Sequence, residues 1–280
     1  MTRKLGGNLN KYYYFARLNL IGTYTNKENF LHNSLTSNYY YPNNKYEWGF
    51  INVDRIVYDK RILFCGKLVK FIDDVEEEVV NKDHKEKNSV NVQNKIIAEA
   101  NFILDCKTGI MAYNEVSGKI GYKQFIENFA AIIERALPDN LVQAEIKFIL
   151  DQTDFFTSLY SLDKVSKVKI ALHPSNPNSR HLWKDTDERL QKMKAQRYRQ
   201  TFESNEGLQI EEDDKLKGDL TMSIDGYGTS EVEGVKDNKV ISISTKESPI
   251  KQKGIVDGDK IEIIRSVWNK FEVVFRRMSN

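Results

Sequence analysis

The pattern of apolar and polar residues predicts β-strands through the N-terminal part of the chain. The aromatic-rich run from Lys11 to Gly22 has partial alternation and predicts a first strand. EWGFINVDRIVYD and RILFCGKLVKFID predict two further strands separated by a short polar turn. IIAEANFILDCKTGIMAYNEVSG predicts two more strands, with Gly109 supplying a positive φ in the turn between them.

A highly charged run, DDVEEEVVNKDHKEKNSVNVQNK, lies between these two groups of strands. Its many charges predict a solvated connection, because such runs are usually exposed to water. A marginal pair of strands is the alternative interpretation.

The spacing of apolar residues then becomes helical. Pro138 ends this segment, because proline cannot continue a helix. We therefore expect residues 1–138 to form a β-rich N-terminal domain closed by one helix. The apolar stripe of that helix comprises Phe125, Phe129, Ile132, Ile133 and Ala136.

The second half of the chain alternates between strand and helix patterns. NLVQAEIKFIL and VSKVKIALHP predict strands, and DQTDFFTSLYSLDKV predicts a short helix between them. LTMSIDGYGTSEVEGV and KVISISTKESPIKQKGIV predict a β-hairpin after an acidic linker, and the last segment has the apolar spacing of a helix. Residues 139–280 are therefore expected to form an α+β domain with a basic helix and a β-hairpin.

The order of these segments predicts an α+β fold for the whole chain. We expect two mostly antiparallel sheets, each packed by one or two helices. Strand, helix and hairpin in succession make the second part similar to a split βαβ unit.

A basic helix is predicted from PSNPNSRHLWKDTDERLQKMKAQRYRQ, with Asn178 or Ser179 as its N-cap. Its buried stripe would comprise Leu182, Trp183, Thr186, Leu190 and Met193. Another face carries Arg189, Lys192, Gln196 and Arg199 at intervals of three and four residues. Such side chains bind phosphates and base edges, although cations near a helix C-terminus also simply favour the helix dipole. The expected contacts extend to Arg180, Lys184 and Arg197, with Lys167 and Lys169 as further candidates.

The glycine-rich segment IDGYGTSEVEG predicts a bent strand. Tyr227 lies between Gly226 and Gly228, where we expect it to be exposed and able to stack on a nucleic-acid base. A purely structural bend is the alternative.

A nuclease-like signature is spelled by Pro138-Asp139 followed by Glu145 and Lys147. In metal-dependent nucleases two carboxylates hold Mg²⁺, and a lysine lies beside the attacking water. The two acids are close in sequence here, and Asp139 directly follows a helix-ending proline, which favours coincidence. Asp105 on the preceding strand could replace Asp139 as a ligand.

The histidines offer a second candidate for catalysis. His173 and His181 flank PSNPNSR, where they could face one another beside Asp185 or Asp187 and bind a metal or act as a base. Their positions at a strand end and a helix start give a structural alternative.

Composition limits these possibilities. The chain is 40% apolar and 29% charged, which is typical of a globular protein and excludes wholesale disorder. Its net charge of +2 confines any nucleic-acid site to a local patch. No run approaches the roughly 18 apolar residues of a membrane span, and no signal peptide is evident. Cys65 and Cys106 are expected to be buried free thiols in a reducing cytoplasm.

The order of elements, with the words LHPSNPN and DGYG, resembles a loosely related group of bacterial phage-defence proteins. The group includes an uncharacterised domain family of defence islands and, more distantly, phage-exclusion proteins of the Rex A type and the B component of the Kiwa system. The resemblance implies a dimeric, DNA-binding sensor or regulator without catalytic activity. It assigns a role to no individual residue.

We therefore expect a cytoplasmic, homo-oligomeric component of an anti-phage defence system that binds nucleic acid, and DNA in particular, without a cofactor or a membrane. A second protein of the same defence operon is a further expected partner. The alternatives are a Mg²⁺-dependent nuclease and a protein-interaction subunit of a defence complex.

Overall fold

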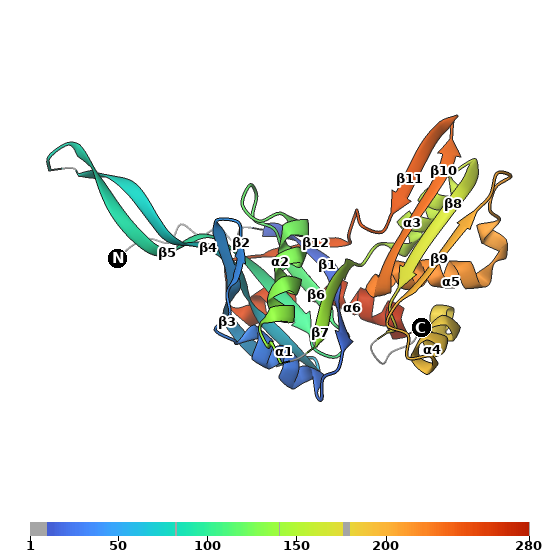
Figure 1. The fold of residues 1–280 in the computed structure, drawn as a ribbon, viewed down its shortest axis with the longest axis horizontal. Coiled ribbons are helices and arrows are strands. Elements are labelled where there is room, and N and C mark those ends of the chain that lie inside the picture. Colours follow the sequence, from blue (N-terminus) through green and yellow to red (C-terminus); the bar gives the residue numbers. More distant parts are fainter. Residues whose placement is uncertain (1–9, 82, 140, 176–179, 280) are drawn as a thin grey trace.

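Two antiparallel sheets with helices packed on them make up the protein (Figure 1), which confirms the expected α+β class. The computed structural model describes residues 10–81, 83–139, 141–175 and 180–279. Among the helices of these ranges, none has both the length and the apolar character needed to cross a membrane.

The larger sheet has eight strands in the order β12-β1-β6-β5-β4-β3-β2, with β7 also paired to β1. Its strands are β1 (Asn10–Gly22), β2 (Tyr41–Asn43), β3 (Tyr46–Tyr58), β4 (Arg61–Asn81), β5 (Glu86–Asp105), β6 (Ile110–Asn114), β7 (Val142–Phe148) and β12 (Lys251–Ile255). The first strand, the β3–β4 pair and the β5–β6 pair are where the sequence predicts them. Gly109 has a φ of 74° between β5 and β6, as expected.

Helices cover both faces of this sheet. The helices are α1 (Lys27–Leu35), α2 (Tyr122–Arg135) and α6 (Lys260–Ser279). On one face, Phe129 of α2 packs edge-on against Phe102 at 5.1 Å. On the other face, Phe271 of α6 packs against Phe15 at 5.2 Å. The predicted apolar stripe of α2 is confirmed, and the sheet is buried on both sides because its strands alternate between the two helical layers.

The larger sheet and the helices packed on it contain segments that lie before and after the expected domain boundary at residue 138. β7 follows that boundary and pairs antiparallel with β1, and so does β12. The C-terminal helix α6 packs on the same sheet. The larger sheet is therefore completed by segments that are distant in sequence.

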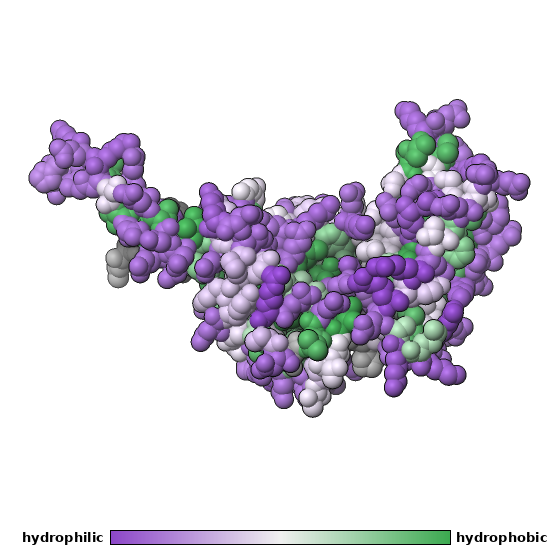
Figure 2. Space-filling model, in the orientation of Figure 1, coloured by the Kyte–Doolittle hydropathy of each residue, from purple (hydrophilic) through white to green (hydrophobic). Residues whose placement is uncertain are grey.

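The charged run at residues 73–95 forms a long hairpin, so the expected solvated loop is wrong and the alternative of a strand pair is right. β4 and β5 stay paired out to Asn81 and Glu86. This arm extends away from the body of the molecule (Figure 1) and is mostly hydrophilic in the view of Figure 2. Side-chain pairs join its two strands: Val75 lies opposite Val92, and Lys87 lies 2.6 Å from Glu78.

The smaller sheet has four strands in the order β11-β10-β8-β9. They are β8 (Lys164–Leu172), β9 (Tyr198–Glu203), β10 (Gly228–Lys236) and β11 (Lys239–Ser244). Its helical segments are α3 (Gln152–Tyr160), η1 (His181–Trp183), α4 (Lys184–Lys192), η2 (Ile210–Glu212), α5 (Asp214–Met222) and the π-turn η3 (Ser223–Tyr227). β8 is antiparallel to both β9 and β10, so these two run parallel on either side of it. With α5 between them in the chain, β9 and β10 form a split βαβ unit, but from other segments than the sequence predicted, which were β8, the basic helix and the hairpin.

Several sequence predictions in this part are wrong. The expected acidic linker contains η2 and α5, and the end of KVISISTKESPIKQKGIV forms β12 of the larger sheet, so that only β11 pairs with β10. The basic helix ends at Lys192, because Lys194 adopts a φ of 51° and the chain turns into β9. The strand predicted across LTMSIDGY is the end of α5 and the π-turn η3, and β10 begins only at Gly228. Gly226 ends the helical path with a φ of 86°, and a Cβ there would lie 2.8 Å from Cβ of Arg17. The proposed N-cap residues of the basic helix, Asn178 and Ser179, lie outside the described residues.

Candidate nucleic-acid interface

Arg180 lies in the interior, which overturns its expected role as a surface contact. Its Nη1 lies 3.3 Å from the fully buried carboxylate of Asp225. Arg277 of α6 lies 2.9 Å from the other carboxylate oxygen, and Nε1 of Trp183 donates to the first at 3.0 Å. Burial lowers the pKa of Arg277, partly offset by Asp225. This cluster joins η1, η3 and α6, and it has no phosphate-accessible face on Arg180.

Tyr227 is also buried, so the prediction of an exposed stacking residue is wrong. Its exposed fraction is 1%. The guanidinium of Arg17 lies over its ring at 4.1 Å from the centroid, and Trp183 packs against it edge-on. The flanking glycines therefore allow close packing against Arg17 and β8. They do not expose the tyrosine.

Glu145 and Lys147 of the nuclease-like signature form an ion pair at 2.8 Å. Glu145 also accepts a hydrogen bond from Nε2 of His173 at 3.0 Å and forms an ion pair with Arg197. The hydrogen bond from His173 is the largest influence holding the pKa of Glu145 well below its usual range, against the opposing effect of burial. Both oxygens of this carboxylate already face cations, which is the environment of a structural ion pair.

The other proposed metal ligands lie in different settings. Asp139 is exposed in a turn after α2. Asp105 is fully buried, accepts from the backbone nitrogen and hydroxyl of Thr108, and lies 3.4 Å from Arg61. Within the described residues, no group of three acidic, histidine or cysteine side chains is arranged to hold a metal ion. This geometry does not favour the nuclease alternative.

The two candidate histidines have different surroundings. His173 is buried, with Nδ1 3.1 Å from the backbone oxygen of Gln196 and Nε2 at Glu145. Both ring nitrogens of His173 therefore already have a partner within the protein. His181 is exposed in η1, and the carboxylate of Asp187 instead accepts from Ser175. These contacts favour the structural interpretation of both histidines.

The expected basic face is divided between the two sides of the smaller sheet. Tyr198 and Gln200 of β9 are half-buried, whereas Arg199 between them is exposed. Because successive side chains of a strand point to opposite faces, Arg199 lies on the open face of the sheet, away from α4. The candidate Lys169 lies on that same face, where it pairs with Glu233 at 3.3 Å.

Four exposed cations remain near α4 and the start of α5. We define the basic surface as Arg189, Lys192, Lys194 and Lys215. In the described part of the chain none of the four has an acidic partner, unlike Lys184, which pairs with Glu188 at 3.5 Å. Sequence reasoning missed Lys194 and Lys215. Lys194 was inside the basic run, but Lys215 lay in a segment expected to be an acidic linker.

A small cavity opens within this surface. Its volume is about 100 Å³, and its lining includes the cations Arg189, Arg197 and Lys215. Leu190, Met193 and Tyr198 supply an apolar wall. Gln196 is exposed beside it in the turn before β9. Arg189 and Lys215 have no acidic partner among the described residues and suit an anion such as a phosphate group, whereas Arg197 is already paired with Glu145.

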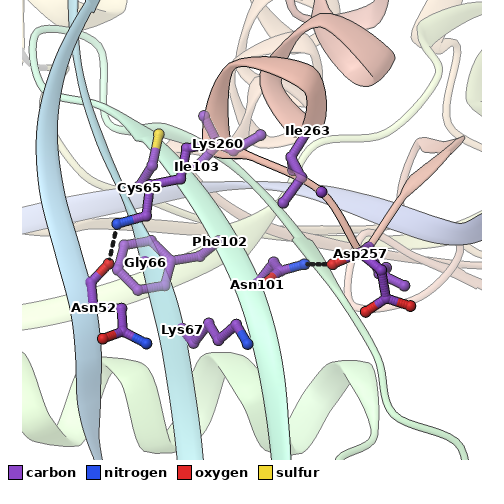
Figure 3. Close-up of a pocket in the computed structure, with 12 residues that line it drawn as sticks. Asn52, Cys65, Gly66, Lys67, Asn101, Phe102, Ile103, Asp257, Lys260 and Ile263 are labelled. Carbon is purple, nitrogen blue, oxygen red and sulfur yellow. Dashed lines mark hydrogen bonds between the residues drawn. The ribbon is translucent and has the colours of Figure 1, made fainter. Parts of the chain in front are cut away.

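A different cavity, of about 280 Å³, lies between the larger sheet and the start of α6 (Figure 3). Its cations are already paired: Lys67 lies 2.5 Å from Glu99, and Lys260 lies 2.5 Å from Asp54. Asn101 points toward the segment before α6 and donates to the carbonyl of Val256 at 2.9 Å. Burial raises the pKa of the Cys65 thiol to about 12, so it is not a thiolate nucleophile at neutral pH. The cavity at α4 is therefore the better candidate site.

Comparison with known proteins gives a family but no function. A family model described as a domain of unknown function, DUF4747, matches residues 12–270. No curated protein matches the sequence. The expected link to phage defence therefore remains a prediction.

Proposed function

The chain belongs to the DUF4747 family, a domain of unknown function, and on that premise we propose that it binds nucleic acid through the basic surface. The observation that carries the proposal is the cavity lined by Arg189 and Lys215, two cations of the basic surface that have no acidic partner among the described residues. Lysine and arginine side chains that hold phosphates supply most of the affinity for nucleic acid.

Charge placement supports this surface over the open face of the smaller sheet and over the arm. The lysines Lys167 and Lys169 on the open face of the smaller sheet are neutralised by Glu203 and Glu233. The arm carries five acids along β4 between residues 73 and 78, which repel a phosphate backbone. A ligand rich in phosphate is therefore attracted to α4 and α5. The role of this binding in phage defence, as sensor or regulator, is part of the same proposal and rests on the resemblance in sequence.

The test is binding of labelled oligonucleotides by the triple variant Arg189→Glu, Lys192→Glu and Lys215→Glu. We expect it to lose at least about a hundredfold in affinity, because each reversal removes a phosphate contact and adds repulsion. The matched control reverses three exposed cations elsewhere, Lys239, Lys246 and Arg265, for the same change in net charge. Equal losses in both variants would show a nonspecific effect of charge, and no loss in the first would refute the proposal.

A further inference from the structure

A second, larger cavity adjoins the basic surface. Its volume is about 720 Å³, and it lies between α3, η1, α4 and α5. Thr186 and Lys215 line both this cavity and the small cationic one. The volume falls within the range of about 300–1,000 Å³ that is typical of sites for small ligands. The two cavities are thus neighbours that share a wall.

The aromatic residues of α3 give the larger cavity a stacking surface. Phe156 and Tyr160 line it, with ring centroids 5.6 Å apart and a tilt of 33°. Tyr160 is 45% exposed, and Leu182 on the other side of the cavity is 50% exposed. Apolar side chains left this exposed around a cavity mark a surface suited to a planar, partly apolar ligand.

Polar groups in the same cavity suit the edge of a nucleobase. Asp185 has no cationic partner among the described residues, and its carboxylate can accept from an exocyclic amino group. Gln152 accepts from Arg180 through its oxygen at 3.1 Å, which leaves its amide nitrogen to donate to a base carbonyl. Acid and amide together match the donors and acceptors of a base better than they match a second phosphate.

We propose that the two cavities together hold one unpaired nucleotide of a single-stranded nucleic acid. The phosphate lies between Arg189 and Lys215, and the base enters the larger cavity against Phe156 and Tyr160. A base within a duplex is paired and stacked, so it cannot reach this cavity without being flipped out at a cost of a few kcal/mol. This inference rests on the proposed function, and it adds the class of nucleic acid and the aromatic contact.

The experiment compares single-stranded and duplex oligonucleotides of one sequence, with 2-aminopurine as a fluorescent base in the single strand. We expect the wild-type protein to bind the single strand more tightly and to quench the probe. The variant F156A/Y160A should lose about tenfold in affinity for the single strand, because base stacking on aromatic rings supplies much of such binding. Its affinity for the duplex should be unchanged. Tyr12→Ala is the control, since Tyr12 is 41% exposed but lies on β1.

A third variant separates loss of stacking from loss of folding. F156L/Y160L keeps apolar side chains on α3, and it should show the same loss of affinity with an unchanged melting temperature. If single strand and duplex bind equally and neither double variant changes the affinity, the inference is overturned while the proposed function stands. If the triple charge variant also binds like the wild type, both are overturned.

Discussion

The carboxylate of Glu145 lies 3.0 Å from Nε2 of His173, and this contact joins β7 of the larger sheet to the end of β8 in the smaller sheet. Lys147 lies 2.8 Å from the same oxygen, and Arg197 binds the other. One carboxylate thus contacts His173, Lys147 and Arg197, which come from three separate segments. The residues that suggest a metal site in the sequence therefore form a set of polar contacts that joins the two sheets. We call this set, which comprises Glu145, Lys147, His173 and Arg197, the Glu145 cluster.

The Glu145 cluster gives a prediction about how the stability of the protein depends on pH. His173 and Lys147 lower the pKa of Glu145 below its unfolded value of 4.5. A depressed pKa in the folded state contributes stability that is fully present above pH 4.5 and is lost as the pH falls through the folded value. We expect Glu145→Gln to lower the free energy of unfolding by about 2 kcal/mol at pH 7, as for other hydrogen bonds to charged groups.

The measurement is denaturant unfolding of wild type and variant at several pH values. The difference in the free energy of unfolding should narrow as the pH falls below 4.5, because the carboxylate of the unfolded chain then takes up a proton while that of the folded protein stays charged. Glu127→Gln, at an exposed acid on α2, is the control and should show no such difference. A difference that is constant from pH 3 to pH 7 would contradict the assignment.

The buried carboxylate of Asp225 gives a second prediction. It neutralises Arg180 and Arg277 in the interior, at 3.3 and 2.9 Å. Asp225→Ala leaves both guanidinium groups without their counter-ion, and we expect a loss of about 3–5 kcal/mol in the free energy of unfolding. Chemical denaturation followed by tryptophan fluorescence measures it, since Trp183 donates to this carboxylate. Asp73→Ala, at an exposed acid, should change stability by less than about 0.5 kcal/mol; similar losses in both would refute the role of the cluster.

Local pattern was sufficient for the elements whose partners are close in sequence. The stripe of α2 and the β3–β4 hairpin follow from spacing and turn residues alone, and both are confirmed. The prediction of the basic helix was wrong at its C-terminal end, because polar residues at helical spacing are equally compatible with a turn followed by a strand. Lys194 adopts a left-handed backbone conformation after the end of the helix, and the spacing of charged residues does not predict such a conformation.

The candidate site depended on contacts between distant segments, which is why sequence reasoning placed it only in part. Arg180 is interior because Asp225 and Arg277 lie beside it, 45 and 97 residues further along the chain. Tyr227 is buried because Arg17 covers its ring. Lys215 joins Arg189 because α5 packs beside α4. Each of these positions is set by the fold and has no local signature.

The arm should be dispensable for folding, which is a third prediction. Its strands pair only with each other, and a two-stranded ribbon is at most marginally stable in water on its own. Replacing residues 75–92 by an Asn-Gly turn should therefore leave the free energy of unfolding within about 0.5 kcal/mol of the wild type. Phe71→Ala, at the buried base of the arm, should instead cost about 3–5 kcal/mol. A shortened protein that melts like Phe71→Ala would show that the arm stabilises the body.

The salt dependence of binding gives the last prediction, and it depends on the proposed function. Each phosphate contact to a single strand contributes a slope of about −0.7 in a plot of log affinity against log salt concentration. The four cations of the basic surface therefore predict a slope of about −3. Lys192→Gln and Lys215→Gln should each reduce its magnitude by about 0.7 for every sequence tested, because phosphate contacts read no bases. Lys239→Gln on β11 should leave it unchanged. A slope near zero in the wild type would refute phosphate recognition by this surface.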